Sequence, residues 1–401
     1  MKTVLRLSDR INVLEESATI AMSKLSRELL AGGEEVINLS LGEPDFDTPQ
    51  FIKDTAVKAL KENFTHYSPV AGFTDLREAV ADKLKRENGL TYHSSQIIVS
   101  TGAKQSLMNA IFCVVNPGDE VLVPTPYWGS YSEMIKLAGG IPVFIPGAME
   151  NNFKITAEQL ECKITERTKL FMFSSPNNPT GSVYTKEELA ALVVVFEKYP
   201  AIYILSDEIY EHINYIGKHH SIAQFEQVKE RVLLINGFSK AYAMTGWRLG
   251  YMAASSIVVA AAEKLQGQTT SGTSSITQKA GLAAYSMTQN SVHEMSQIFK
   301  KRRDLVYSLL SEIPGLKTNK PEGAFYFFPD VSAYFGKKTI HGNVINNAKD
   351  LAYYLLFIGN VATVSGDSFG NANHLRISYA ASEPDLVNGL IQIKRALLIL
   401  I

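Results

Sequence analysis

The sequence has little of what would place the chain outside the cell, in a membrane or on nucleic acid. Only two of its 401 residues are cysteines, Cys113 and Cys162. Two cysteines are too few for a disulfide framework, which favours a reducing, cytoplasmic location. Because no run of about 18 apolar residues occurs and the first twenty residues lack a signal-like apolar core, we expect neither a membrane span nor a secretion signal. The net charge of −1 provides no basic surface for nucleic acid.

The composition is that of an ordinary globular enzyme, with 46% hydrophobic and 20% charged residues. From about residue 97, short apolar runs alternate with helical patterns, which predicts βαβ units. Nearly continuous apolar strands are typical of a parallel sheet covered by helices on both faces. The expected strands are IIVS at 97–100, EVLVP at 120–124, KLFMFSS at 169–175, AIYIL at 201–205 and RVLLIN at 231–236. Thr185 and Glu188 form a capping-box pattern ahead of a helix over 189–196.

The last third of the chain has a different pattern. Helical spacing runs from about Ser274 to Leu310, and the strand-like segments GAFYFFPD and HLRISYA follow. This order predicts a second, smaller α+β domain. We expect residues 46–285 to form the large α/β domain, and residues 1–45 to join residues 286–401 in the small one. The aromatic run FYFF at 325–328 is expected to lie in the core of the small domain.

Polar residues follow several of the expected strands, at the edge where open parallel sheets bind ligands. Asn178, Asp207 and Lys240 each come after a different strand. Gly102 and Ala103 lie in the turn TGAK, a strand-to-helix junction whose backbone amides can hold a phosphate. A carboxylate that closes a buried strand needs a cation or several donors. A lysine in such a setting can have a pKa low enough for its amine to act as a nucleophile.

Taken singly, each of these residues also has a structural interpretation. Asp207 could cap a helix or pair with Arg248, and Lys240 could be an ordinary lysine. One ligand, however, requires all of them: an aldehyde for the lysine, a ring nitrogen for the carboxylate and a phosphate for the turn. That ligand is pyridoxal 5'-phosphate, which withdraws electrons when its ring nitrogen stays protonated beside a carboxylate.

A series of longer segments then carries a family resemblance, from about Ser17 to the C-terminus. In order they are SLGEPDFDTP, YSPVAGFTDLREAV, STGAKQ, PTPYW, SSPNNPTG, SDEIYEH, NGFSKAYAMTGWRLGY and LRISYA. The chain resembles the class I pyridoxal-phosphate aminotransferases of fold type I, close to the bacterial aspartate aminotransferases. The resemblance implies one class I/II aminotransferase unit, a homodimer with shared active sites, and a ping-pong transfer of the amino group from L-aspartate or a related amino acid to 2-oxoglutarate.

The resemblance also implies a role for each matching position. Lys240 would bind the cofactor covalently and move the proton during the reaction. Arg376 would bind the α-carboxylate of the substrate, Lys104 its distal carboxylate, and Gly42 would lie in the loop beside it. The other cofactor contacts would come from Gly102, Ala103, Lys104, Trp128, Asn178, Asp207, Tyr210, Ser239 and Arg248, with Tyr67 reaching the phosphate in the neighbouring subunit. Trp128 and Asn178 would also border the substrate. Gly237 departs from the family, because relatives often have Ser or Thr there, and this removes one hydroxyl from the phosphate site.

Several alternatives stay open. The amino donor could be aromatic or neutral, the specificity could be broad, or the fold could serve a pyridoxal-phosphate-dependent carbon-sulfur lyase or a non-catalytic sensor. Relatives that accept prephenate carry a lysine near the N-terminus where this chain has Glu15, so we expect no prephenate activity. His212, His219 and His220 lie close in sequence without carboxylate or cysteine partners at ligand spacing. We therefore expect a surface hairpin there and no metal site.

Overall fold

A seven-stranded sheet forms the centre of the larger part of the protein. The computed structural model describes residues 6–287 and 289–401. In spatial order, the strands are β2 (Ile97–Ser100), β8 (Gly250–Ala253), β7 (Val232–Gly237), β6 (Tyr203–Asp207), β5 (Thr168–Ser174), β3 (Glu120–Thr125) and β4 (Ile141–Pro146). All neighbours pair in parallel except those of β8, which runs antiparallel to β2 and β7. The predicted, mostly parallel sheet is confirmed, whereas β4 and the reversed β8 had not been anticipated.

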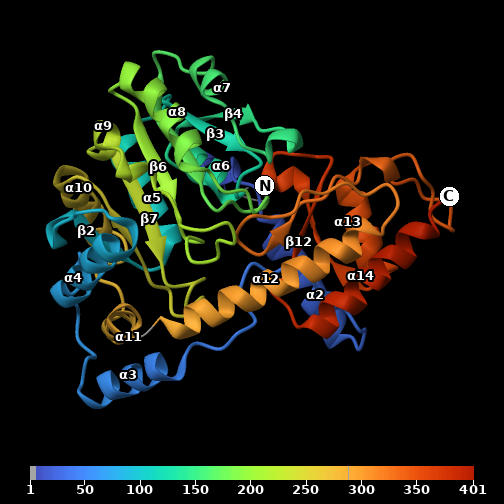
Figure 1. The fold of residues 1–401 in the computed structure, drawn as a ribbon, viewed down its shortest axis with the longest axis horizontal. Coiled ribbons are helices and arrows are strands. Elements are labelled where there is room, and N and C mark those ends of the chain that lie inside the picture. Colours follow the sequence, from blue (N-terminus) through green and yellow to red (C-terminus); the bar gives the residue numbers. More distant parts are fainter. Residues whose placement is uncertain (1–5, 288) are drawn as a thin grey trace, which may run out of the picture.

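Helices cover both faces of this sheet, as its apolar strands require (Figure 1). One face packs against α4 (Thr74–Lys83), α8 (Lys186–Lys198) and α11 (Ser275–Ser286). The other packs against α5 (Ala103–Val114), α6 (Ser130–Leu137) and α10 (Ser256–Gly267). The shorter helices α7 (Ala157–Glu161) and α9 (Glu226–Lys229), together with α3 (Gln50–Lys61), lie around them. The capping box of α8 is confirmed, since Thr185 and Glu188 each bond the other's backbone amide.

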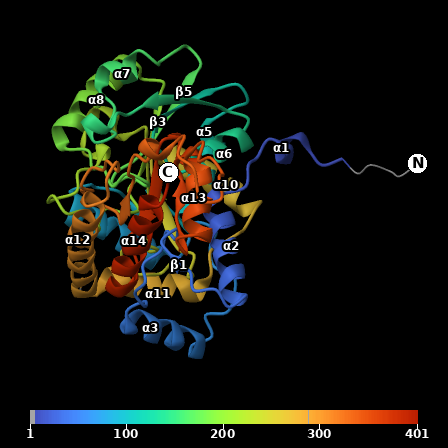
Figure 2. The same cartoon turned by 90° about the vertical axis from the view of Figure 1, so that its right-hand side faces the viewer.

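The second part of the protein combines segments from both ends of the chain. β1 (Ile37–Asn38) pairs with β10 (Val361–Ala362), and β9 (Tyr326–Phe327), β11 (Val364–Ser365) and β12 (Leu375–Ser378) form a three-stranded sheet. The helices around them are α2 (Ala18–Ala31), α12 (Asn290–Ser311), α13 (Ala348–Phe357) and α14 (Glu383–Leu398). α1 (Asp9–Asn12) lies outside this body, beside α6 (Figure 2). A shared apolar core that runs from Met22 to Leu400 supports the predicted small domain, although the boundaries after residues 45 and 285 remain a proposal.

The strand ends place the functional residues at one edge of the large sheet. β2, β3, β5, β6 and β7 run in the same direction, so the segments that follow them meet there. The turn before α5 follows β2, Trp128 follows β3, Asn178 follows β5 and Lys240 follows β7. β6 extends two residues beyond its predicted end, so that Asp207 is itself the last strand residue. GAFYFFPD forms a strand only at Tyr326–Phe327, but its four aromatic residues are buried as expected.

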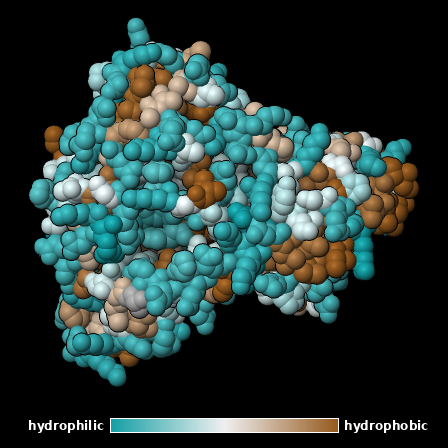
Figure 3. Space-filling view, in the orientation of Figure 1, coloured by the Kyte–Doolittle hydropathy of each residue, from teal (hydrophilic) through white to brown (hydrophobic). Residues whose placement is uncertain are grey.

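The surface is polar over most of the large part, and apolar residues gather where α13, α14 and the C-terminus lie (Figure 3). Phe357, Leu398 and Ile401 are among the exposed apolar residues of this region. Throughout the described chain, none of the helices combines the length and apolar character that crossing a bilayer takes. Cys113 and Cys162 are both free thiols. The predicted cytoplasmic location stays a prediction.

Candidate active site

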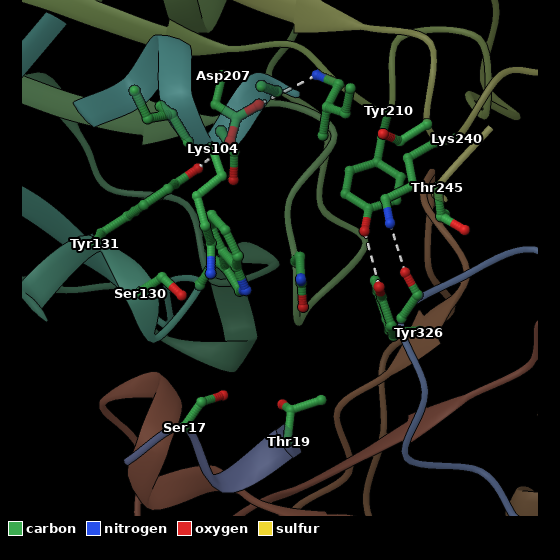
Figure 4. A pocket seen from close by; sticks show the side chains of 18 of the residues that line it. Ser17, Thr19, Lys104, Ser130, Tyr131, Asp207, Tyr210, Lys240, Thr245 and Tyr326 are labelled. Carbon is green, nitrogen blue, oxygen red and sulfur yellow. Dashed lines mark hydrogen bonds between the residues drawn. The ribbon is translucent and has the colours of Figure 1, made fainter. Parts of the chain in front are cut away.

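A cavity of about 280 Å³ opens at the edge of the sheet where the strand ends meet. Its walls come from the N-terminal segment, from the loops after five strands and from β9 and β12 (Figure 4). Among the residues expected at the site, those that line this cavity are Gly42, Ala103, Lys104, Trp128, Asn178, Asp207, Tyr210, Ser239, Lys240, Arg248 and Arg376. Residues up to 334 positions apart in sequence are thus brought together, as the resemblance implied.

Lys240 extends into the cavity from the segment after β7, and its Nζ donates a hydrogen bond to the carbonyl oxygen of Gly42 at 2.5 Å. The ring of Tyr210 lies 5.9 Å from the same nitrogen. Desolvation lowers the pKa of Lys240 to about 8, and Arg376 and Arg248 act in the same direction while Glu43 and Asp207 oppose it. An amine with this pKa is partly neutral near physiological pH, which is the state that attacks a carbonyl carbon.

Asp207 is buried at the end of β6 and is the one carboxylate among the cavity-lining residues. Its Oδ2 accepts a hydrogen bond from the hydroxyl of Tyr131 at 2.6 Å, and its Oδ1 accepts one from the amide of Ile209 at 3.2 Å. Burial raises the pKa of Asp207 to about 6, whereas these two donors lower it. A carboxylate in this position suits a cationic nitrogen brought by a ligand.

The start of α5 and the segment after Lys240 form a second end of the cavity. Gly102 is the residue before α5, with φ of 84°, and a side chain there would collide with the guanidinium of Arg248. Arg248 itself has a positive φ of 56°, which is uncommon for a residue with a side chain. Its Nη1 donates to the carbonyl oxygen of Thr245 at 2.8 Å. A helix N-terminus beside a guanidinium is a favourable place for a phosphate.

Arg376 is almost completely buried on β12, with 1% of its surface exposed. Its Nη1 donates to Asn178 Oδ1 at 3.1 Å and its Nη2 to the carbonyl oxygen of Ser40 at 2.6 Å. The guanidinium stacks 4.6 Å from the ring of Tyr326, while its Nε has no partner in the described chain. A buried guanidinium held by neutral groups is suited to bind the carboxylate of a ligand.

Lys104 lies in the first turn of α5, at the rim of the cavity, with its Nζ 4.7 Å from the ring of Trp128. Partial burial and the charge of Arg248 lower the pKa of Lys104. Ser17 and Thr19 lie across the cavity from Asp207, on the segment that begins α2 (Figure 4). Lysine in a first helical turn is unfavourable for the helix, so its presence beside this cavity favours a contact with an anion.

The cavity therefore has an excess of positive charge in a chain whose net charge is −1. Lys104, Lys240, Arg248 and Arg376 line it together with the single carboxylate of Asp207. Over residues 6–287 and 289–401, none of the four cations has a carboxylate oxygen within 4.0 Å, as the described ion pairs all involve other residues. Such a cavity fits a ligand with several negative charges and one cationic ring nitrogen.

Comparison with known proteins agrees with this chemistry. The family model for aminotransferase class I and II matches residues 34–393. The chain belongs to the class I and II aminotransferase family. A probable aspartate/prephenate aminotransferase of Rhizobium leguminosarum is 47% identical over 97% of this chain and 98% of that protein. A bifunctional aspartate aminotransferase and glutamate/aspartate-prephenate aminotransferase of Petunia hybrida is 45% identical over 98% of this chain and 82% of its own.

Solved structures extend the comparison to the whole fold of this aminotransferase. The aspartate aminotransferase of Rhizobium meliloti superposes with a TM-score of 0.96 at 40% identity, covering 99% of this chain and all of that one. The Thermus thermophilus aspartate aminotransferase with maleate gives a TM-score of 0.92 at 39% identity, covering 98% of this chain and 100% of that one. The predicted family, enzyme class and fold type I architecture are confirmed.

Two expected residues of the aminotransferase do not line the cavity. Gly102 lies against the guanidinium of Arg248, and Tyr67 is 98% exposed to solvent.

Gly237 has no room for the hydroxyl-bearing side chain found in relatives, since a Cβ would lie 2.9 Å from Gly250 on β8. Conversely, Tyr131 and Tyr326 line the cavity and had not been identified from the sequence. Tyr326 lies in the aromatic run expected in the core, and Tyr131 follows the PTPYW segment without a sequence signal that sets its hydroxyl group apart.

The prediction for the histidine segment was wrong in part. His219 is buried against Glu208 at 2.9 Å, and His212 contacts Glu87 at 2.9 Å, so these two histidines do have carboxylate partners. Sequence spacing could not reveal the contact of His212, because Glu87 lies 125 residues away, whereas Glu208 lies only 11 residues before His219 and was overlooked. Glu87 belongs to the π-helical turn η1 (Leu84–Asn88), which continues α4.

This cluster has carboxylates and imidazoles close enough together to hold a metal ion, in the groups Glu87, Glu211 and His212, and Glu208, Glu211 and His219. However, the ammonium of the fully buried Lys83 is in hydrogen-bond contact with Glu211 and lies 3.6 Å from Glu87. In this aminotransferase the ammonium of Lys83 thus provides the positive charge beside these carboxylates. The absence of a metal ion stays a prediction.

Proposed function

We propose that the cavity binds pyridoxal 5'-phosphate, and that the protein transfers the amino group of an acidic amino acid, L-aspartate, to 2-oxoglutarate. The observation that carries this proposal is the charge of the cavity. Lys240 with its lowered pKa and the buried, carboxylate-free Arg376 face a cavity that has Asp207 as its one carboxylate. No common metabolite other than an aldehyde-bearing pyridine phosphate matches an amine, a buried carboxylate and a phosphate-binding helix start together.

When bound, the cofactor supplies an aldehyde carbon and a ring that withdraws electrons from the substrate's α-carbon. Asp207 would hold the protonated ring nitrogen, because a full negative charge beside it favours the cationic form. Tyr210 and Asn178 would donate to the phenolic oxygen, and Trp128 would lie against the ring. The phosphate would be held by the backbone amides at Gly102 and Ala103 and by the side chains of Ser239 and Arg248.

Lys240 would perform the proton transfer. Its Nζ is an amine in the cavity, and its lowered pKa makes the neutral form available near pH 7 to 8. The hydrogen bond to the carbonyl oxygen of Gly42 fixes the position of this nitrogen within the cavity. With the cofactor bound, Nζ would accept the proton from the α-carbon of the substrate and would donate a proton back during the transfer.

Two cations would select a dicarboxylate. Arg376 presents a planar guanidinium that suits the α-carboxylate, and Lys104, which also lines the cavity beside Trp128, would bind the distal carboxylate. The name of the Rhizobium meliloti structure and the maleate in the Thermus thermophilus structure support a dicarboxylic substrate, since maleate carries two carboxylates. Glu15 in place of the lysine of prephenate-accepting relatives leads us to propose that prephenate is not a substrate, although similar proteins bear that name.

The proposal also includes a homodimer. Tyr67 is nearly fully exposed in the single chain, which is unusual for a large aromatic side chain. A partner subunit that placed Tyr67 beside the neighbouring phosphate would bury this ring. The family resemblance assigns it that role.

A panel of half-reactions tests the proposed function. The protein loaded with pyridoxal 5'-phosphate is mixed with aspartate, glutamate, alanine, phenylalanine or a cysteine conjugate, and the cofactor absorbance and products are followed. We expect aspartate and glutamate to give the corresponding 2-oxo acids fastest. Faster conversion of phenylalanine or alanine would favour a broad or aromatic specificity, and pyruvate from the cysteine conjugate would favour a carbon-sulfur lyase.

A further inference from the structure

Tyr131 makes a contact with the site that the proposed mechanism does not use. It is the second residue of α6, is 1% exposed, and lines the cavity. Its hydroxyl donates to Asp207 Oδ2 at 2.6 Å, which is shorter than the 3.2 Å contact from the amide of Ile209 to Oδ1. Short hydrogen bonds to an ionised carboxylate are among the stronger ones in proteins.

The surroundings of Asp207 give this contact its importance. The titratable groups that face the carboxyl are Tyr131 from α6, Glu208 and Tyr210 from the segment that carries Asp207, and Lys240 from the segment after β7. Burial is the largest influence and raises the pKa of Asp207 to about 6, and Glu208 adds to this effect. Tyr131 is the strongest opposing group, ahead of Ile209 and Lys240. The charge of the carboxyl therefore depends on a neutral donor.

Tyr131 is well placed to remain that donor. Its own burial and the neighbouring charge of Asp207 raise the pKa of Tyr131 well above its usual value, so its hydroxyl stays protonated. The amide of Tyr131 donates to the carbonyl oxygen of Trp128 at 2.8 Å, and the two rings meet edge to face at 5.6 Å. One turn of chain thus carries both the aromatic side chain expected to lie against the cofactor and the hydroxyl that reaches Asp207.

We propose that Tyr131 is a positioning residue that fixes the carboxylate of Asp207 through Oδ2 and keeps it ionised for the ring nitrogen of the cofactor. The part of this role that concerns the ring nitrogen rests on the proposed function. The contact between Tyr131 and Asp207 does not, because it exists within the protein alone. The two can therefore be tested separately.

The first test uses the full chain without cofactor. Infrared difference spectroscopy with labelled aspartate follows the protonated carboxyl band of Asp207 against pH, with the Asp207→Asn variant identifying the band. We expect Tyr131→Phe to raise the carboxyl pKa by about one to two pH units, as the loss of a hydrogen bond to a charged group implies. The control is Tyr285→Phe, which removes a buried hydroxyl whose partner is Tyr251 rather than a carboxylate. An unchanged titration in Tyr131→Phe would overturn the proposal.

The second test measures cofactor affinity at pH 7. Tyr131→Phe should bind pyridoxal 5'-phosphate about 2- to 10-fold more weakly, since a smaller fraction of Asp207 is ionised. For an analogue with carbon in place of the ring nitrogen, the affinity of Tyr131→Phe should equal that of the unaltered protein. In an Asp207→Asn background, the same substitution should cost no further affinity.

Equal losses for the cofactor and the carbon analogue would mean that Tyr131 only supports the shape of the cavity, which would overturn the proposal. Circular dichroism and thermal unfolding of each variant show whether the fold is retained. If the unaltered protein failed to bind pyridoxal 5'-phosphate, the proposed function would fail, while the infrared titration would still decide whether Tyr131 controls the charge of Asp207.

Discussion

Replacing Lys104 by serine should change substrate preference more than general activity. The side chain lies at the cavity rim beside Trp128, with no carboxylate partner in the described chain, so its charge is available to a ligand. A hydrogen bond to a charged group contributes about 1.5–3 kcal/mol. Because Lys104 is only partly buried and solvent screens its charge, we expect the lower part of this range, about 1.5–2 kcal/mol. The kcat/KM for aspartate and glutamate should therefore fall about 10- to 30-fold.

Neutral amino acids provide the internal comparison. Alanine and phenylalanine keep their α-carboxylate and with it the contact to Arg376, so their kcat/KM should stay nearly unchanged in Lys104→Ser. The matched control is Lys186→Ser, which removes an exposed lysine from the first turn of α8, away from the cavity. It should change neither class of substrate. Half-reactions followed by cofactor absorbance give the constants for each amino acid.

The pH dependence adds a second signature. Burial and Arg248 lower the pKa of Lys104, so its charge is lost at lower pH than in an ordinary lysine. The preference for acidic over neutral substrates should accordingly decline as the pH rises through that lowered pKa, and this decline should be absent in Lys104→Ser. Equal losses for acidic and neutral substrates would refute the reasoning. Lys104 would then support the phosphate or the helix, and a broader aminotransferase would be the better description.

Three other predictions follow from the same contacts. Asp207→Asn should lower turnover about 100-fold or more in a folded protein, and global unfolding instead would make the aspartate structural. Mixed Tyr67→Phe and Lys240→Ala chains should form hybrid dimers with one intact site, whereas activity equal to the sum of the separate variants would contradict shared sites. Lys83→Met leaves Glu211 buried without its cation and should lower the free energy of unfolding in urea by about 3–5 kcal/mol. Lys198→Met breaks the exposed pair of Lys198 with Glu161 and should leave the free energy of unfolding almost unchanged. Equal losses of stability in the two variants would show that burial of the pair does not matter.

Much of the large sheet could be predicted from the sequence because its strands are nearly continuous apolar runs. Asn178, Asp207 and Lys240 could be placed at one edge since the ends of parallel strands meet there. β4 was missed because Pro142 and Pro146 interrupt its apolar residues, and five of its six residues, among them Ile141 and Phe144, are not buried. The reversal of β8 was missed because strand direction is set by neighbours and leaves no local pattern.

The contacts that hold the site residues in place could not be predicted in this way. Tyr131 meets Asp207 across 76 residues, and Lys83 meets Glu211 across 128. Such pairs depend on how α4 and α6 pack against the sheet, and a tyrosine or lysine in a helix looks the same in sequence whether it is exposed or buried. The role of Tyr67 was suggested only by the family resemblance, and its 98% exposure becomes apparent only once the fold is known.

The most direct measurement of the central claim is to locate the covalent attachment of the cofactor. The protein is loaded with pyridoxal 5'-phosphate, reduced with borohydride, digested and analysed by mass spectrometry. We predict one modified peptide that contains Lys240, and a Lys240→Ala variant that still binds the cofactor but has lost transamination, because the described cavity offers no other base at that position. Modification of another lysine such as Lys104, or near-normal transamination by Lys240→Ala, would contradict the account.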